Sequence, residues 1–216
     1  MYLIDETYFI KDLAVPNSKP SLDIPDNEVA FEVYIDKYAR LLLQNALGNV
    51  LFDDLNSDIE NGSLKSDADQ KWKDLVNGKS YEYNGKTFKW KGLLFTEGAF
   101  KGSVLAQYTY YHWHLDQISQ MSGIGEVKGN AVNTTNVNST RRSVKVWNEY
   151  IEMYQGGAAQ DSYKFSYVNG IPFHDYFTQD VSDYVSLLTF LSHNETDYPD
   201  ALMKVEKEGY KNTFGI

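Results

Sequence analysis

TEGAFKGSVLAQYTYYHWHLDQISQM, residues 96–121, is the stretch from which most of the architecture can be inferred. Its apolar side chains recur at steps of four, four, three, four and three residues, which is the period of one face of an α-helix: Phe100, Val104, Tyr108, Tyr111, Leu115 and Ile118. A second stripe with Ala106, Tyr110 and Trp113 lies beside it. We therefore predict a helix from about Thr96 to Met121 that is central in the fold or shared with another chain, because it is apolar over much of its circumference.

Apolar residues at the same spacing predict further helices on both sides of this stretch. A helix face made of Phe31, Tyr34, Ile35, Tyr38, Leu41 and Leu42 follows the cap candidates Asp26 and Asn27 and is closed by Gly48. The remaining helices are predicted over residues 51–62, 66–78, 138–156 and about 178–193, each ending at or near a glycine, an asparagine or a histidine.

Residues 80–90, SYEYNGKTFKW, predict a β-hairpin, because Asn84-Gly85 supplies the two positive-φ positions of a type I′ turn. Counting outward from the turn pairs Tyr83 with Lys86, Glu82 with Thr87 and Tyr81 with Phe88. The alternation then gathers four aromatic rings on one face: Tyr81, Tyr83, Phe88 and Trp90. A lone two-stranded hairpin is marginal in water, so we expect this aromatic face to pack against a helix or a neighbouring subunit.

Composition excludes several classes of protein. The 216 residues contain no cysteine, which excludes thiol chemistry, cysteine-ligated metals and a disulfide-linked scaffold. A net charge of −10 disfavours extensive binding to a phosphate backbone. The sequence lacks a signal-like N-terminus and an apolar run of about 18 residues, so we expect a soluble protein that neither enters a membrane nor is exported. The 15% aromatic content favours a protein whose surfaces serve for contact.

The ends of the chain have no sustained helical period. Residues 1–25 contain three prolines and are predicted to form an extended arm, whose apolar residues Tyr8, Phe9, Leu13 and Val15 become ordered only against a neighbouring subunit. Residues 26–193 form the predicted helical domain, with a loop at 123–138 and a turn or short hairpin within 158–177. Residues 194–216 form a predicted C-terminal tail that ends with Phe214 and Ile216.

Two groups of residues are candidates for chemistry. His112, His114 and Asp116 could bind a divalent metal, but on a helix His112 and Asp116 share a face while His114 points away. We therefore predict no metal site, no cofactor and no catalytic residue. Arg141 and Arg142, together with Lys145, form a basic cluster at a helix start, which is typical of a solvated face and alternatively of a partner or nucleic-acid contact.

Several segments together resemble a known family. They are YFIKDLAVPN (8–17), LG (47–48), KWKDLVNGK (71–79), YNGKTFKWKGL (83–93), GIG (123–125) and NTFGI (212–216). In order and content they are similar to the head-to-tail connector proteins, also called neck or adaptor rings, of tailed bacteriophages, with the closest likeness to those of crAss-like phages of Bacteroidetes. The resemblance covers nearly the whole chain, although none of these motifs is catalytic, and residues 158–177 look like an insertion relative to it.

The resemblance implies a mainly helical, non-enzymatic virion protein. It implies a homo-oligomeric ring of about twelve copies beneath the portal, joining the capsid to the next neck or tail protein. DNA would pass through the ring without specific binding. The fold we expect is a bundle of about four to six helices with one β-hairpin and two extended arms. The interface candidates are Tyr8, Phe9, Leu13, Val15, Tyr81, Tyr83, Phe88, Trp90, Arg141, Arg142, Phe214 and Ile216.

Two other functions remain open from the residues alone. The exposed aromatic face of the hairpin would suit a soluble binding module for carbohydrate or protein. A metal-dependent hydrolase would use His112, His114 and Asp116.

Overall fold

The computed structural model describes residues 3–15, 31–118, 120–122, 125–127, 140–156, 167–168, 171–172, 184–199, 201, 209 and 211, and every structural statement below concerns these residues. The α-helices are α1 (Phe31–Ser57), α2 (Gln70–Asn77), α3 (Val104–Ile118), α4 (Thr140–Gln155) and α5 (Leu187–His193). The strands are β1 (Ile59–Glu60), β2 (Ser63–Leu64), β3 (Lys79–Tyr83), β4 (Lys86–Trp90), β5 (Phe95–Glu97), β6 (Phe100–Gly102), β7 (Gln120–Ser122), β8 (Gly125–Val127), β9 (Tyr167–Val168) and β10 (Ile171–Pro172). Two short 3-10 turns, η1 (Glu6–Tyr8) and η2 (Lys11–Leu13), precede α1.

Helices predominate, as the sequence predicts, but the single predicted hairpin is an underestimate. The described strands form five separate two-stranded antiparallel sheets. One of them, β9–β10, lies in the segment for which a turn or short hairpin was expected. Within the described part of the chain, no helix has both the length and the apolar character needed to cross a membrane.

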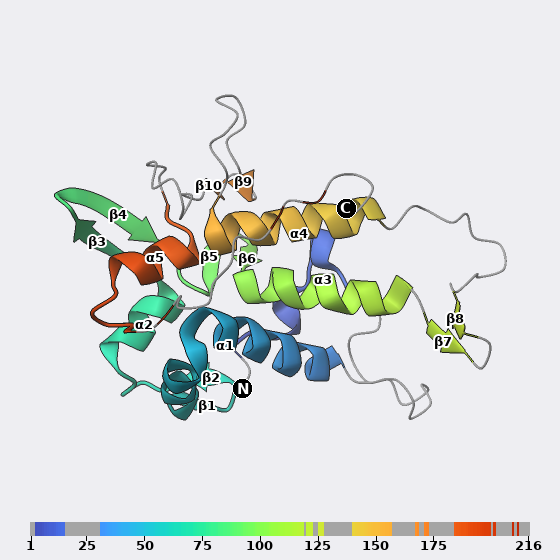
Figure 1. The fold of residues 1–216 in the computed structure, drawn as a ribbon, viewed down its shortest axis with the longest axis horizontal. Helices are drawn as coiled ribbons and strands as arrows, with labels where there is room; N and C mark the ends of the chain where they lie inside the picture. Colours follow the sequence, from blue (N-terminus) through green and yellow to red (C-terminus); the bar gives the residue numbers. More distant parts are fainter. Residues whose placement is uncertain are drawn as a thin grey trace.

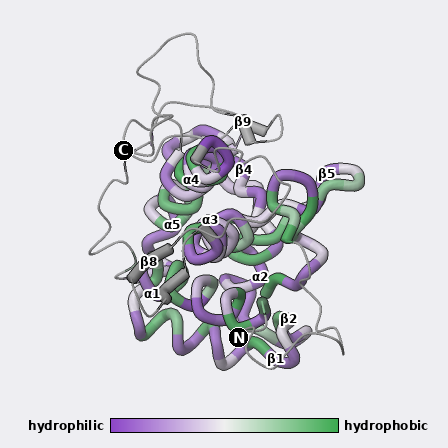
Figure 2. Tube along the Cα trace, turned by 90° about the vertical axis from the view of Figure 1, so that its right-hand side faces the viewer, coloured by the Kyte–Doolittle hydropathy of each residue, from purple (hydrophilic) through white to green (hydrophobic). Residues whose placement is uncertain are grey.

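Helix α3 is the centre of the molecule. It lies between α1 and α4 and packs against both (Figures 1 and 2). Tyr108 of α3 touches an aromatic ring on each neighbour, with its ring centroid 6.2 Å from Tyr38 of α1 and 5.0 Å from Tyr150 of α4. The ring of Tyr111 lies 4.6 Å from Trp147, which also belongs to α4. The prediction of a central aromatic helix is therefore confirmed.

The start of α3 differs from the prediction. Residues 96–102 form most of the β5–β6 hairpin, and the helix begins only at Val104. Gly98 has a φ of +59°, and a Cβ at Gly102 would lie 2.3 Å from the ring of Phe95, so both glycines suit a tight hairpin better than a helix. The Ser103 hydroxyl then accepts a hydrogen bond of 3.1 Å from the Leu105 amide, which begins the helix.

Helix α1 breaks at the predicted place but ends earlier than predicted. Gly48 interrupts it with a φ of +77° and a ψ of 166°, and the following segment continues only to Ser57. Ile59, which was expected on the second helix, belongs to β1 instead. Asn61-Gly62, interpreted from sequence as a helix end, has positive φ at both residues and turns the β1–β2 hairpin. An Asn-Gly pair can serve in either setting, and here the hairpin forms.

The hairpin of residues 80–90 is confirmed in register and turn. Tyr83 pairs with Lys86, Glu82 with Thr87 and Tyr81 with Phe88, and Asn84 and Gly85 both have positive φ. Its aromatic face packs on α5, where Trp90 stacks on Phe190 at 5.4 Å.

Helix α5 is shorter than predicted. Ser186 caps its N-terminus, accepting a hydrogen bond from the Thr189 amide, so Tyr184 and Val185 precede the helix. Val185 instead forms a parallel bridge with Trp90 of β4. The predicted start near Thr178 lies outside the described residues.

We predict that Trp90→Ala lowers the free energy of unfolding by about 3–5 kcal/mol, because it removes a large buried ring. Trp90 is 4% exposed and donates a 2.9 Å hydrogen bond from Nε1 to the Leu75 carbonyl. Lys89→Ala, an exposed neighbour on the same strand, is the control and should change stability by less than about 0.5 kcal/mol. Urea unfolding followed by circular dichroism measures both, and equal midpoints for the two variants would contradict the packing described.

Candidate contact surfaces

The N-terminal residues 3–15 belong to the core of the subunit, contrary to the expectation of an extended arm. Leu3, Ile4, Phe9 and Leu13 are buried. The Phe9 ring meets the Phe31 ring edge to face at 4.5 Å, next to the start of α1. Two 3-10 turns give this short segment the curvature that places its apolar residues on one side, which a search for helix or strand periodicity cannot detect.

Polar contacts from α4 and β6 also hold residues 3–15 in place. Lys145 of α4 forms an ion pair with Asp12, and Lys101 of β6 donates a 2.7 Å hydrogen bond to the Thr7 hydroxyl. The Lys101 ammonium also lies 5.3 Å from the centroid of the Tyr8 ring. Tyr8 and Val15 are half-buried against the core, so the four predicted contact residues of the arm are engaged largely within their own chain.

The described part of the C-terminal tail lies along α4. Trp147 donates a 2.9 Å hydrogen bond from Nε1 to the Gly209 carbonyl, while Asn148 donates to the carbonyl of Lys211 at 3.0 Å and accepts from its amide at 2.9 Å. The Lys211 ammonium lies 5.2 Å from the centroid of the Trp147 ring. The predicted contact residues Phe214 and Ile216 lie outside the described residues.

The aromatic face of the β3–β4 hairpin is covered by its own chain. Tyr81, Phe88 and Trp90 are buried, and Tyr83 stacks on His193 of α5 at 3.9 Å between ring centroids. The Tyr81 hydroxyl lies 3.0 Å from Nδ1 of His193, and burial raises the pKa of Tyr81 well above its ordinary value. A ligand could reach these rings only after α5 moved away, so the face does not offer the open platform that a carbohydrate-binding module needs.

The helical phase separates the candidate metal ligands, as predicted. His112 stacks on Tyr38 of α1, with ring centroids 4.4 Å apart and planes 7° from parallel. His114 stacks instead on Tyr110 at 5.5 Å. Within the described ranges, no group of three or more His, Cys, Asp or Glu residues is placed to hold a metal ion.

His112 lies in an environment that opposes its protonation. Its Nε2 atom is buried and has no hydrogen-bond partner among the described residues. Burial lowers the pKa of His112 to about 4; the carboxylate of Asp116 opposes this shift, while the ammonium groups of Lys37 and Lys211 add to it. His112 is therefore a neutral histidine inside an aromatic cluster, with Asp116 of the same helix as its nearby carboxylate.

The basic cluster at the start of α4 is divided between solvent and the subunit. Arg141 and Arg142 are exposed, and Arg142 approaches the Tyr110 hydroxyl at 3.5 Å. Lys145 is engaged by Asp12 and, at 3.7 Å, by Glu149. Burial raises the pKa of Glu149, against the opposing effects of Lys145 and of a 3.0 Å hydrogen bond from Gln107. Arg141 and Arg142 are therefore the solvent-exposed arginines of this cluster, with Arg142 also in contact with Tyr110.

Four large apolar side chains that the sequence analysis did not propose as contacts are exposed. Val33 (53% exposed), Leu41 (38%) and Val50 (84%) belong to α1, and Leu115 (39%) belongs to α3. Its spacing predicts Leu41 on the buried face of the helix. In the structure Leu42 and Leu43, both at most 1% exposed, occupy the core there, and Leu41 lies at the surface. Val33 and Leu41 are eight residues apart and so lie along one side of α1.

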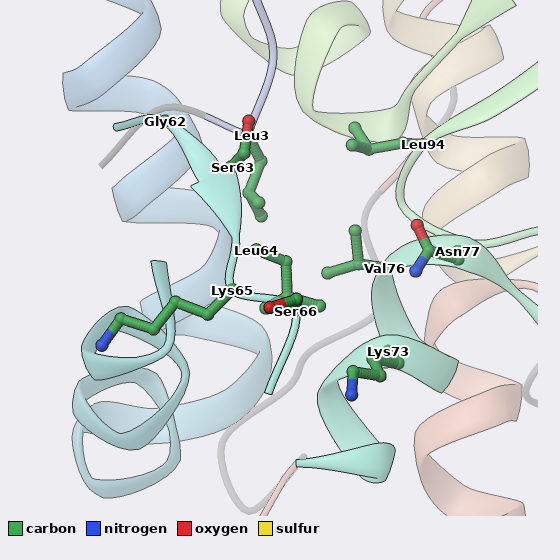
Figure 3. A pocket seen from close by; sticks show the side chains of 10 residues that line it. All are labelled: Leu3, Gly62, Ser63, Leu64, Lys65, Ser66, Lys73, Val76, Asn77 and Leu94. Carbon is green, nitrogen blue, oxygen red and sulfur yellow. The ribbon is translucent and has the colours of Figure 1, made fainter. Parts of the chain in front are cut away.

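A pocket of about 380 Å³ lies between the N-terminal segment, the β1–β2 hairpin and α2 (Figure 3). Leu3, Leu64, Val76 and Leu94 supply its apolar wall. The polar lining residues are Gly62, Ser63, Lys65, Ser66, Lys73 and Asn77. Lys65 donates a 2.7 Å hydrogen bond to the Ser57 carbonyl, and in Figure 3 its side chain points away from Val76. The pocket presents no nucleophile paired with a base.

We predict that His112→Phe makes stability less dependent on pH between about 6.5 and 4. An unfolded histidine has a pKa of about 6.5, so in this range the unfolded chain binds a proton that the folded chain, with a pKa of about 4, does not. Acid therefore favours unfolding of the natural chain, and the phenylalanine removes this contribution while preserving the stacking on Tyr38. Chemical denaturation at a series of pH values measures the slope. An unchanged or steeper slope in the variant would contradict the neutral state of His112.

Comparison with known proteins adds no constraint to these surfaces. No family model, curated protein or solved structure matches the chain. Its function therefore has to be argued from the contacts, exposures and charges described above.

Proposed function

We propose that the chain is a structural subunit of a phage neck, which assembles into a ring that joins the portal and capsid to the tail and continues the DNA channel. The proposal rests on the resemblance of its sequence segments to connector proteins, and the features below support it. In this proposal the subunit is not an enzyme and carries no cofactor, and its location is the head-to-tail junction of the virion.

The observation that carries the proposal is the exposed apolar side of α1. Val33 and Leu41 lie on this side with Lys37 midway between them, and all three side chains face solvent in the single chain. Large apolar side chains exposed on one side of a helix suit a surface that another subunit covers. In a closed ring, this side of one subunit packs head to tail against a different surface of the next.

The charge of the chain is compatible with a DNA conduit. Each copy carries −10, so about twelve copies would carry on the order of −120 charges. A channel of that sign repels the phosphate backbone, so that DNA slides through the ring instead of sticking to it. Arg141 and Arg142, which project from the start of α4, then serve as contacts to a neighbouring protein.

The core position of residues 3–15 changes which segments can make the ring. Because Phe9 and Leu13 are buried in their own subunit, they are no longer proposed as contacts. The α1 side takes their place, and Phe214 and Ile216 of the tail remain proposed contacts to the portal or to the next neck protein.

The experiment is to image the purified chain by negative-stain electron microscopy and to measure its mass in solution. We expect rings of the natural chain, and we expect the double variant Val33→Asp, Leu41→Asp to form no rings at a tenfold higher concentration or more, because each interface would bury two carboxylates with only Lys37 between them. Leu115→Asp is the matched control, since Leu115 is as exposed as Leu41 but lies on α3, and rings should persist.

Circular dichroism of each variant shows whether the subunit remains folded. A natural chain that stays monomeric at every concentration, or rings that survive the double substitution, would contradict the proposal.

A further inference from the structure

The β3–β4 hairpin has one edge that no other described element pairs with. In a hairpin with a two-residue turn, the pair next to the turn exchanges both hydrogen bonds, and hydrogen-bonded pairs then alternate with non-hydrogen-bonded pairs. Tyr83, Tyr81 and Lys79 therefore bond inward to β4. The amide and carbonyl groups of Ser80 and Glu82 point outward from β3.

The opposite edge of the hairpin is covered. The outward groups of β4 belong to Thr87 and Lys89, which oppose Glu82 and Ser80. The Val185 amide donates a 2.9 Å hydrogen bond to the Lys89 carbonyl, just before α5. Among the described residues, the Lys89 amide and both outward groups of Thr87 have no backbone partner from another element, but Val185 lies beside Lys89 and leaves only the residue next to the turn for a second strand.

The β3 edge has no comparable cover. Ser80 and Glu82 are exposed, and no backbone hydrogen bond from another element in the described ranges reaches their outward groups. Figure 1 shows the hairpin projecting at one end of the long axis of the molecule. Strand edges of this kind pair with other chains unless something protects them.

We propose that a second copy of this chain pairs with β3, strand to strand and antiparallel, about a two-fold axis at Tyr81. A second copy is the proposed partner because pairing two identical hairpins leaves no further open edge in the sheet. Pairing β3 with β3 of a second copy produces a four-stranded sheet whose two outer edges are both β4, and each β4 is already covered by its own Val185. The sheet therefore closes as a dimer, whereas a strand with two open edges would continue to add chains.

Charge selects the register of this pair. Centring on Tyr81 overlaps all five residues of β3 and places each Glu82 opposite Ser80 of the second copy, where a hydroxyl can donate to the carboxylate. Ser80 and Glu82 then exchange their outward hydrogen bonds, and the two Tyr81 residues form the non-hydrogen-bonded pair at the axis. Centring on Glu82 would place two carboxylates opposite each other, and centring on Ser80 would extend past the start of the strand at Lys79.

This contact is independent of the proposed ring. A two-fold pair closes on itself, whereas ring contacts run head to tail. The β3 edge and the Val33 and Leu41 side of α1 belong to different elements, so the pair is tested on free protein in which the ring contact is removed.

The first experiment compares proline substitutions on the two edges of the hairpin by sedimentation. Glu82→Pro removes an outward amide of β3, and Thr87→Pro removes the outward amide directly opposite on β4, so neither breaks a backbone hydrogen bond between the two strands. Both variants lose the hydrogen bond from the Thr87 hydroxyl to the Glu82 carboxylate, so this loss is matched between them. Both substitutions are made in the Val33→Asp, Leu41→Asp variant, which lacks the ring contact. We expect this variant and its Thr87→Pro form to dimerise and its Glu82→Pro form to shift to monomer, with at least a tenfold weaker association. A monomeric parent variant, or equal dimerisation of the two proline forms, would overturn the proposal.

A second experiment does not depend on tolerance of proline. The chain has no cysteine, so Ser80→Cys and Glu82→Cys each introduce a unique exposed thiol. In the proposed register, oxidation of a mixture of the two variants yields the mixed disulfide in preference to either homodimer. Mass spectrometry identifies the product. Homodimers in equal or greater yield, or no cross-link at all, would show that β3 does not pair in this way.

Discussion

Burial of one aromatic helix on two sides is the constraint on which this structure depends. Tyr108 and Tyr110 of α3 are at most 9% exposed, and rings of this size are stabilised only where other large side chains enclose them. Tyr38 of α1 and Tyr150 of α4 provide that enclosure for Tyr108. The order α1, α3, α4 follows, and the remaining parts of the fold are arranged around this layer (Figure 1).

The elements predicted correctly are those whose signal is local. The period of α3 and α4 and the Asn84-Gly85 turn are each contained within a few residues. The bounds of α4 and of the β3–β4 hairpin are nearly those predicted, whereas α3 begins later than predicted. The errors occur where distant residues decide the outcome. Residues 3–15 become part of the core because Phe31 receives Phe9, and residues 96–102 form a hairpin because Phe95 packs over Gly102. Contacts between residues far apart in the sequence leave no periodic pattern in it.

The same distinction applies to the candidate surfaces. Separation of His112 from His114 follows from helical geometry alone and was predicted. That the aromatic hairpin face meets α5, more than ninety residues later in the chain, could not be read from the hairpin itself. Leu41 shows the reverse case, because spacing places it near the buried face of α1 while its neighbours Leu42 and Leu43 fill the available core. The exposure of a side chain depends on what packs beside it, so the Val33 and Leu41 side of α1 could be identified only from the structure.

The measurement that tests the central claim most directly is native-state hydrogen exchange of the isolated monomer at low denaturant concentrations. If residues 3–15 and the α1, α3, α4 layer form one core, the amides of Phe9 and Leu13, which donate to Glu6 and Ile10, exchange only with the cooperative unfolding that exposes the amides of α3. Exchange of Phe9 and Leu13 at rates near those of an unfolded chain, while α3 stays protected, would contradict this account and restore an arm that orders only in the assembly.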